Sequence, residues 1–274
     1  MGKNHKKILL VRSKFTKRAW LTDVVGNRLT PKFKIVRKIN LGRFVTLYTT
    51  KGTIIYHRHI PQLLYNGVGL NINSYIPRIE KLAKNIYVIK FNYNKSDLFD
   101  GNGNKLFEYG FENVINTNNN VIIVRKDGLW GMIDEDLNWI VKPSFSALSE
   151  FDVKGYCIVG LEQNSKIAVI DKSGNYILKP VCYQAAHFCN SDLLIVSNNG
   201  KHGVINLKGD VLVPAEFDLI VLKHGYFIVQ ENAKYGIVDL QGNIIVQCIC
   251  SAINEEQDRF IIHTPIQVLE LAFN

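Results

Sequence analysis

The sequence predicts an all-β protein built from about seven repeated units, and three observations support this prediction. Turn signals recur about every 35 residues, short apolar segments lie between them, and helical periodicity is nearly absent. The chain has 274 residues, 47% of them hydrophobic, which is enough to bury a substantial core. We therefore expect a single repeat domain over residues 1–274, with basic, divergent repeats at 1–120 and regular repeats at 121–274.

Each predicted unit contains an Asp or Asn at the end of an apolar strand, which we call the anchor. A Gly follows three positions later in every copy except one, which has Leu137, and a Leu or Ile follows six positions later. The spacings are 33 to 37 residues, except for a spacing of 43 between the first two anchors. The pattern places the anchors at Asp23, Asn66, Asp100, Asp134, Asp171, Asn206 and Asp239.

The chemistry of the anchor segment predicts a tight hairpin turn. An Asp or Asn side chain can accept a hydrogen bond from a downstream backbone N–H, and Gly provides the positive φ that such turns need. A Pro stands eight or nine residues after four anchors, at Pro31, Pro143, Pro180 and Pro214. Because Pro cannot donate a hydrogen bond to a sheet, we expect it to end the second strand. Fresh apolar strands are expected to begin at Tyr87, Val121, Tyr156, Leu193 and Tyr226.

One such unit cannot bury both faces of its own small sheet, so neighbouring units must stack. Seven copies suit a seven-bladed β-propeller, in which closure of the ring removes exposed sheet edges. The apolar segments 8–12 and 266–273 could then meet to close the ring. The alternative is an open β-solenoid or curled sheet, because units of about 35 residues are short for propeller blades. Residues 77–85 form the only stretch that could make a turn or two of helix.

The C-terminal repeats resemble WG (also called KWG) β-repeat proteins. The segment LWGMID from Leu129 contains the whole signature, and HGVIN from His202 and YGIVD from Tyr235 keep its Gly, whereas IAVID from Ile167 keeps neither Trp nor Gly. The resemblance covers residues 121–253 well and residues 15–120 weakly, with Trp20 before Asp23 as its clearest trace there. It implies a bacterial interaction module and no catalytic residues, so Trp130, Gly131 and the anchors are expected to be structural.

Charge separates the two halves of the sequence. Residues 1–100 contain 20 Lys and Arg against 4 Asp and Glu, a balance of +16, whereas residues 101–274 contain 13 against 20, a balance of −7. Aromatic residues are interleaved with the N-terminal cations, a combination that suits an anionic partner. The candidate residues for binding a partner or nucleic acid are Lys14, Lys17, Arg18, Arg28, Lys32, Lys34, Arg37, Lys38, Arg43 and Arg58.

These observations lead to three hypotheses about function. The first is a non-enzymatic interaction scaffold or adaptor that docks protein partners through its basic N-terminal units. The second is a nucleic-acid-binding subunit of a ribonucleoprotein complex, for which single-stranded or structured RNA suits a β surface better than duplex DNA. The third is a small hydrolase at a propeller mouth, with its activity near His57 or His59.

Possible chemical sites are few, and for each we favour a structural interpretation. The pair His57 and His59 shares a strand face, but metal sites need three or four ligands, so we expect a solvent-facing pair. The segment Asp100–Asn104 resembles the start of a Ca²⁺ loop but lacks the later Gly and Glu, so we expect a hairpin. The thiols of Cys248 and Cys250 are expected to be buried apolar groups. We predict no catalytic residue, metal or cofactor.

The remaining features concern the cellular compartment. The five cysteines do not have the spacing of a disulfide framework, and their odd number means that they cannot all pair. Both observations favour reduced thiols in a cytoplasm. No apolar run approaches the roughly 20 residues that span a bilayer, so no membrane partner is expected. The richness in Asn, Lys and Ile is typical of an AT-rich genome. The oligomeric state does not follow from the sequence.

Overall fold

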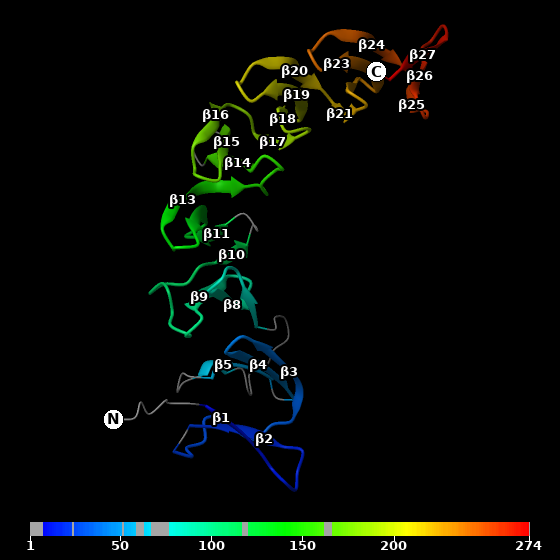
Figure 1. The fold of residues 1–274 in the computed structure, drawn as a ribbon. Coiled ribbons are helices and arrows are strands. Elements are labelled where there is room, and N and C mark those ends of the chain that lie inside the picture. Colours follow the sequence, from blue (N-terminus) through cyan, green and yellow to red (C-terminus); the bar gives the residue numbers. More distant parts are fainter. Residues whose placement is uncertain are drawn as a thin grey trace. The chain divides into compact units, whose positions relative to one another are not determined.

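The computed structural model describes residues 8–23, 25–50, 52–58, 63–66, 77–116, 120–161 and 166–273. Within these residues every regular element is a β-strand, which confirms the predicted all-β class (Figure 1). The chain divides into two compact units, residues 1–143 and 144–274, and the boundary falls inside strand β13 (Trp139–Leu148).

The N-terminal unit contains a series of antiparallel sheets formed by strands adjacent in sequence. The first two sheets matter most for the candidate site. They comprise β1 (Leu9–Arg12) with β2 (Ala19–Thr22), and β3 (Ile35–Leu41), β4 (Phe44–Thr49), β5 (Gly52–His57) and β6 (Leu63–Asn66). The strands that follow are β7 (Arg78–Lys81), β8 (Ile86–Asn92), β9 (Lys95–Asp100), β10 (Asn113–Asn116), β11 (Val121–Lys126) and β12 (Leu129–Asp134).

The C-terminal unit repeats the same up-and-down pattern with greater regularity. Its strands are β14 (Tyr156–Leu161), β15 (Lys166–Asp171), β16 (Tyr176–Val181), β17 (Ala185–Phe188), β18 (Leu193–Asn198), β19 (Lys201–Asn206), β20 (Val211–Phe217), β21 (Leu219–Lys223), β22 (Tyr226–Glu231), β23 (Lys234–Asp239), β24 (Ile244–Cys250), β25 (Ala252–Glu255), β26 (Arg259–His263) and β27 (Val268–Ala272). The fresh strands expected at Tyr156, Leu193 and Tyr226 begin at those residues, and the two full units form four-stranded sheets, β17–β20 and β21–β24.

The anchor turns have the predicted chemistry. In the turn at Asp239, Oδ1 accepts hydrogen bonds from the backbone N–H groups of Gln241 and Asn243 at 2.9 and 2.8 Å, and Oδ2 accepts one from Asn243 Nδ2 at 2.8 Å. Gly242 follows with a φ of +93°. The same backbone hydrogen bonds recur at Asp23, Asp100, Asp134, Asp171 and Asn206. Leu137 takes the place of the turn Gly with a φ of +68°, and packing against a buried cluster offsets its strained backbone.

The anchor assigned to the second unit was wrong. Anchors pair with the first residue of the preceding strand, as Val121 pairs with Asp134, and in the second sheet the corresponding pair is Phe44 and His57. Asn66 instead ends β6, the fourth strand of its sheet. His57 therefore occupies the anchor position, 34 residues after Asp23, and the 43-residue spacing lies between His57 and Asp100. The rest of the segment that had suggested Asn66, residues 67–72, falls outside the described residues.

Three of the repeat prolines lie within strands, so the prediction that Pro ends the strand was wrong for them. Pro143 is inside β13. Pro180 is inside β16 and Pro214 is inside β20. The pairing register shifts at the last two places, between Leu178 and Val181 and between Val213 and Phe217. A β-bulge leaves residues unpaired, so it accommodates a residue that cannot donate a hydrogen bond.

The same bulge explains the Gly of the repeat signature. A Cβ on Gly203 would lie 2.6 Å from the carbonyl oxygen of Val213 and 2.7 Å from the nitrogen of Ala215, closer than real Cβ atoms approach backbone. Gly131 and Gly236 face the bulged strand at equally short distances. The bulged backbone crosses directly over these positions, so only a residue without a side chain fits.

The repeat that lacks this Gly has a shorter bulge. In the repeats that contain Gly203 and Gly236, the preceding residue pairs 15 positions downstream, His202 with Phe217 and Tyr235 with Cys250. In the repeat that has Ala168 instead, Ile167 pairs with Val181, 14 positions downstream. One residue fewer in the bulge makes room for the methyl group of Ala168, which is fully buried.

Neighbouring sheets within each unit bury their faces against one another, as expected for stacked repeats. In the N-terminal unit Leu21 and Phe33 of the first sheet form one cluster with Leu47 and Ile54 of the second. In the C-terminal unit Phe227 of β22 packs with the β17–β20 sheet. Full burial of such side chains contributes roughly 1.5–3 kcal/mol each relative to exposure.

Two further expectations concern the ends and the single possible helix. Residues 78–81 of the expected helical stretch form strand β7, because backbone pairing with β8 outweighs weak helical periodicity. The strands expected to close a ring pair locally, β1 with β2 and β27 with β26. The closed seven-bladed ring stays a prediction.

Candidate partner-binding surface

The hairpin between β1 and β2 holds four cationic side chains around one hollow. Ser13 forms the turn: its N–H donates to the carbonyl oxygen of Arg18 at 2.9 Å, and its Oγ accepts from the N–H of Thr16 at 3.1 Å. Short polar residues favour such local side-chain to backbone bonds over continued strand pairing. The turn leaves Arg12 and Arg18 exposed at its two ends, with Lys14 and Lys17 exposed between them.

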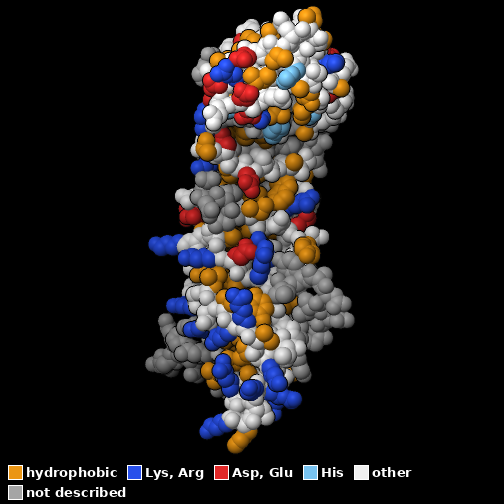
Figure 2. All heavy atoms as spheres, turned by 90° about the vertical axis from the view of Figure 1, so that its right-hand side faces the viewer, with side chains coloured by type: hydrophobic (Ala, Val, Ile, Leu, Met, Phe, Trp, Pro, Cys, Tyr) orange, Lys and Arg blue, Asp and Glu red, His pale blue; other side chains and the backbone are white. Residues whose placement is uncertain are grey.

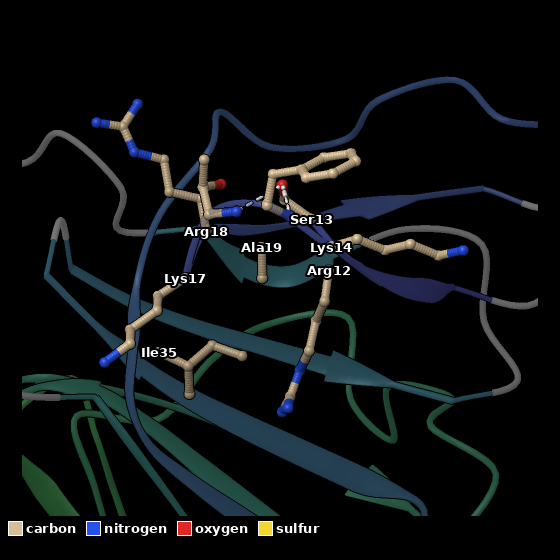
Figure 3. A pocket seen from close by; sticks show the side chains of 9 residues that line it. Arg12, Ser13, Lys14, Lys17, Arg18, Ala19 and Ile35 are labelled. Atoms are coloured by element: carbon tan, nitrogen blue, oxygen red, sulfur yellow. Dashed lines mark hydrogen bonds between the residues drawn. The ribbon is translucent and has the colours of Figure 1, made fainter.

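This hairpin hollow has a volume of about 430 Å³ and is lined by residues 12–19 together with Ile35. In Figure 3 the side chains of Arg12 and Lys17 extend on either side of Ile35, while those of Lys14 and Arg18 extend outward in opposite directions. Among the residues that the structure describes, no acidic side chain lines the hollow. The positive groups therefore frame an open space, which suits an extended anion better than a single small ion.

Two aromatic residues, Phe15 and Trp20, lie next to cations of the N-terminal unit. Phe15, at the tip of the hairpin, is 97% exposed. Trp20 on β2 has the guanidinium of Arg28 and the ammonium of Lys32 over its ring, at 5.3 and 5.4 Å from the ring centroid. Such cation–π contacts hold both cations close to the sheet without neutralising their charge.

The other predicted residues lie on or beside the second sheet. Lys34 immediately precedes β3, and its N–H donates to Thr50 Oγ1 at 3.4 Å. Arg37 and Lys38 are consecutive in edge strand β3, so they point to opposite faces. Lys32 lies over Trp20 and the register of β3 shifts between Ile35 and Arg37, so the cations of residues 32–38 do not all share one face.

Arg43 and Arg58 make single hydrogen bonds to amide side chains. Arg43 donates to Asn102 Oδ1 at 3.2 Å, and Arg58 donates to Asn40 Oδ1 at 3.1 Å. Of the predicted residues, the structure groups Lys14, Lys17 and Arg18 in the hairpin, and it groups Arg28 and Lys32 over Trp20. The others are distributed along the second sheet. Sequence reasoning missed Arg12 as a site residue, although its place in the N-terminal run of cations could have identified it.

We call Arg12 and the ten predicted residues the basic surface. None of them forms an ion pair with an acidic side chain among the described residues. The single acid in residues 8–66 is Asp23. Its carboxylate is engaged in the anchor turn, where a hydrogen bond from the Asn27 side chain holds the pKa of Asp23 below its usual value. Figure 2 shows Lys and Arg side chains gathered over the N-terminal sheets on the face drawn.

The C-terminal unit uses its charges differently. Lys154 pairs with Asp192 at 2.7 Å, Lys201 pairs with Asp218 at 2.6 Å, and Lys223 pairs with Glu255. Because these pairs satisfy cations locally, the unit presents fewer unpaired positive groups. The basic surface is consequently the stronger candidate for contact with an anionic partner.

The other predicted candidates have structural roles where they can be seen. His57 is completely buried, and its Nε2 lies 3.2 Å from the carbonyl oxygen of Gly101, so the expectation that His57 faces solvent was wrong. His59 lies outside the described residues. Burial at the anchor position also removes His57 from any open mouth of the kind the hydrolase hypothesis needs. Asp100 accepts hydrogen bonds from the N–H groups of Asn102 and Asn104, which confirms the hairpin interpretation.

The cysteines are free thiols in differing environments. Cys250 is fully buried and Cys248 is half-buried, and burial raises the pKa of both. Burial raises the pKa of Cys157 to about 12, so that thiol is protonated at neutral pH. Across the described ranges, no group of three or more His, Cys, Asp or Glu side chains could hold a metal ion. The same residues contain no helix with the length and apolarity needed to cross a membrane.

Comparison with known proteins gives one family match. The pattern of the family described as WG containing repeat matches residues 98–130, 130–164, 168–201, 203–235 and 235–258. These five repeats cover more than half of the chain and begin upstream of residue 121, where the good resemblance had been placed. No curated protein matches the sequence.

Several solved structures match the chain at low sequence identity and low TM-score. The computationally designed Ika8 protein is 13% identical, with a TM-score of 0.35 and coverage of 99% of this chain and 97% of its own. BamB from Moraxella catarrhalis is 13% identical, with a TM-score of 0.36 and coverage of 98% and 91%. Hsv2 from Kluyveromyces lactis is 9% identical, with a TM-score of 0.36 and coverage of 81% and 86%.

Proposed function

The chain belongs to the family of WG-containing repeat proteins, and from this premise we propose that it is a non-enzymatic interaction scaffold that docks an anionic partner through its basic surface. The stacked repeats provide a rigid support. The cations of the first two sheets provide the contact. In this proposal the protein acts in the cytoplasm, where its free thiols remain reduced.

One observation carries the proposal: eleven exposed Lys and Arg side chains in residues 8–66 have no acidic partner among the described residues, whereas the cations of the C-terminal unit are repeatedly paired. A concentration of unpaired charge raises the rate and specificity of association with an oppositely charged surface. Clustered like charges also repel one another in the free protein, so an anionic partner relieves that repulsion.

A non-enzymatic role agrees with what the described residues offer. The buried His57 and the protonated Cys157 are not placed to act as an acid, a base or a nucleophile at an open surface. The four-residue turns that carry Asp side chains use those carboxylates to bind backbone N–H groups. The acidic side chains of the repeat therefore support the fold.

A quantitative cross-linking pull-down with the full chain from its native host tests this proposal. The test variant carries Lys32→Glu, Lys34→Glu, Arg37→Glu and Lys38→Glu, four exposed positions outside the core. A control variant carries two reversals on the C-terminal unit, Lys179→Glu and Lys208→Glu, at exposed positions without an ion pair among the described residues, and is compared with the Lys32→Glu, Lys34→Glu pair alone as well as with the full test variant. Each pull-down is repeated after nuclease treatment.

We expect the wild type and the control to retain the same partner and the basic-surface variant to lose it. Retention of every partner by a folded basic-surface variant contradicts the proposal. The nuclease arm shows whether the partner is held directly or through nucleic acid. Circular dichroism and thermal melting verify that the variants are folded.

A further inference from the structure

On the basis of the proposed function, we propose that the hairpin hollow binds single-stranded nucleic acid, with successive backbone phosphates on its four cations and an unstacked base on Phe15. The chemistry required is a phosphodiester chain with accessible bases, which RNA and single-stranded DNA share. The inference depends on the charges around the hollow, the exposure of one ring and the shape of the hairpin.

The charges around the hollow match a phosphodiester. Arg12 and Arg18 stand at the two ends of the turn, and their guanidinium groups can each donate two parallel hydrogen bonds to phosphate oxygens. Lys14 and Lys17 add point charges between them. Because no carboxylate of the described residues lines the hollow, an entering phosphate meets no like charge from them. The volume of about 430 Å³ falls within the roughly 300–1,000 Å³ typical of ligand sites.

The exposure of Phe15 indicates a partner with a flat apolar group. A Phe ring that is 97% exposed gains nothing from the protein's own packing, and it stands in the chain directly between Lys14 and Thr16. Nucleobases stack on such rings, and the stacking tolerates any base because every base has a π face. A ring next to cations is the arrangement used by surfaces that bind single strands.

The shape of the site favours a single strand over a duplex. Specific reading of B-form DNA needs an element that enters the major groove, and the bases of a duplex are stacked within it. The hairpin presents its ring at a short turn held by Ser13. A single strand can place a free base against this ring while its backbone follows the cations.

Fluorescence anisotropy with the full chain tests the inference. The probes are fluorescein-labelled oligo(U), oligo(dT), a duplex of the same length and an abasic strand with the same number of phosphates. Phe15→Ala is the test variant for stacking, and Tyr176→Ala is its matched control because Tyr176 is a half-exposed ring on the C-terminal unit. Lys14→Glu with Lys17→Glu is the test variant for charge, and Lys179→Glu with Lys208→Glu is its control.

We expect oligo(U) and oligo(dT) to bind more tightly than the duplex and the abasic strand. Phe15→Ala should weaken binding of the two base-containing strands on the order of tenfold, as loss of one stacked base requires, and leave the abasic strand unaffected. Four phosphate contacts predict that log Kd rises with log salt concentration with a slope of about 3. The two control variants should bind like the wild type.

Three outcomes overturn the inference. The first is no binding of either single strand, the second is equal affinity for the abasic strand, and the third is equal weakening by the control and test variants. If one of these outcomes occurs but the basic surface still captures a protein partner after nuclease treatment in the pull-down, the inference fails and the proposed function stands. If that capture fails as well, both fail. Preference for oligo(U) over oligo(dT) identifies RNA as the ligand source, and the opposite preference identifies DNA.

Discussion

The first two sheets and the C-terminal unit differ in two respects, although the first sheet has the same anchor turn, at Asp23, as the C-terminal unit. In the C-terminal unit the signature position holds Gly203 and Gly236, and several surface cations, such as Lys201 and Lys223, are paired with carboxylates. In the first two sheets the same position, three residues before the anchor, holds Trp20 and Ile54, and the cations are unpaired. The regular repeats maintain the fold, and the divergent ones have surface chemistry available for binding.

This comparison separates what the repeat requires from what it permits. The anchor turn is retained at Asp23 as well as at Asp239, so the turn is a requirement in both regions. The signature Gly is required only where the following strand has the longer bulge, as at Gly203. Where the bulge is shorter, as between Ala19 and Phe33, Trp20 occupies the position and presents its ring to cations. A shorter bulge thus leaves room for a large side chain at this position.

The largest effect is predicted for Gly203→Ala. The added methyl group would lie 2.6 Å from the carbonyl oxygen of Val213, which is backbone and cannot rotate away. Overpacking of this kind costs about 1–3 kcal/mol of the free energy of unfolding, and a backbone clash belongs at the upper end. Urea denaturation of the full chain, followed by circular dichroism, measures the change.

Ala168→Gly is the matched control for this substitution. It occupies the same repeat position over a shorter bulge, and it should cost only about 1 kcal/mol through increased freedom of the unfolded backbone. If Gly203→Ala proves as mild as Ala168→Gly, the bulge does not explain the signature Gly, and the distinction between the two kinds of repeat loses its physical basis.

Much of the fold could be predicted because the turn chemistry is local. The anchors from Asp100 onward, with their Gly and Asn neighbours, specify hairpins whatever surrounds them, and the structure contains those hairpins. The second unit was assigned wrongly because His57 replaces the anchor carboxylate there and leaves no local signal. The equivalence of His57 to Asp134 is visible only in the pairing register, which depends on contacts between strands.

The location of the candidate site could be predicted from the charge of the sequence, but the arrangement of its side chains could not. The run of Lys and Arg identified the region, because composition alone shows unbalanced charge. It could not show that Lys32 turns to Trp20 or that Arg12 and Ile35 complete the hairpin hollow, because these contacts depend on how the first two sheets pack. The bulge beside Ile35 likewise alters which cations share a face, and a bulge follows from pairing rather than from local preference.

A smaller effect is predicted for charge reversals that compare the two regions. Lys201→Glu breaks the pair with Asp218 and places two negative groups together, so it should lower Tm by about 1–3 °C. Lys38→Glu removes one cation from an unbalanced surface, so it should leave Tm unchanged or raise it slightly. Thermal melting at low and high salt measures both changes, and high salt should shrink the difference. An equal decrease in Tm for the two variants would contradict the contrast between paired and unpaired cations.

The smallest effect is predicted for the anchor turn, where the two regions agree. A hydrogen bond from the Asn243 side chain, followed by backbone N–H groups, holds the pKa of Asp239 below its ordinary value of 3.8, with burial opposing it. A lowered pKa in the folded state means that the stabilisation is complete above pH 3.8 and is lost as the pH falls below it. Asp239→Asn should therefore reduce the drop in Tm between pH 6 and pH 3 by ~1–2 °C. Asn206→Asp should not reproduce the behaviour of Asp239, because the Asn206 amide donates to the Asp210 carboxylate at 2.8 Å and an Asp at that position would repel it. Asp23→Asn should behave as Asp239→Asn does, because the carboxylate makes the same bonds in both turns. A different response at Asp23 would show that the positive surroundings of the basic surface, rather than the turn, control that carboxylate.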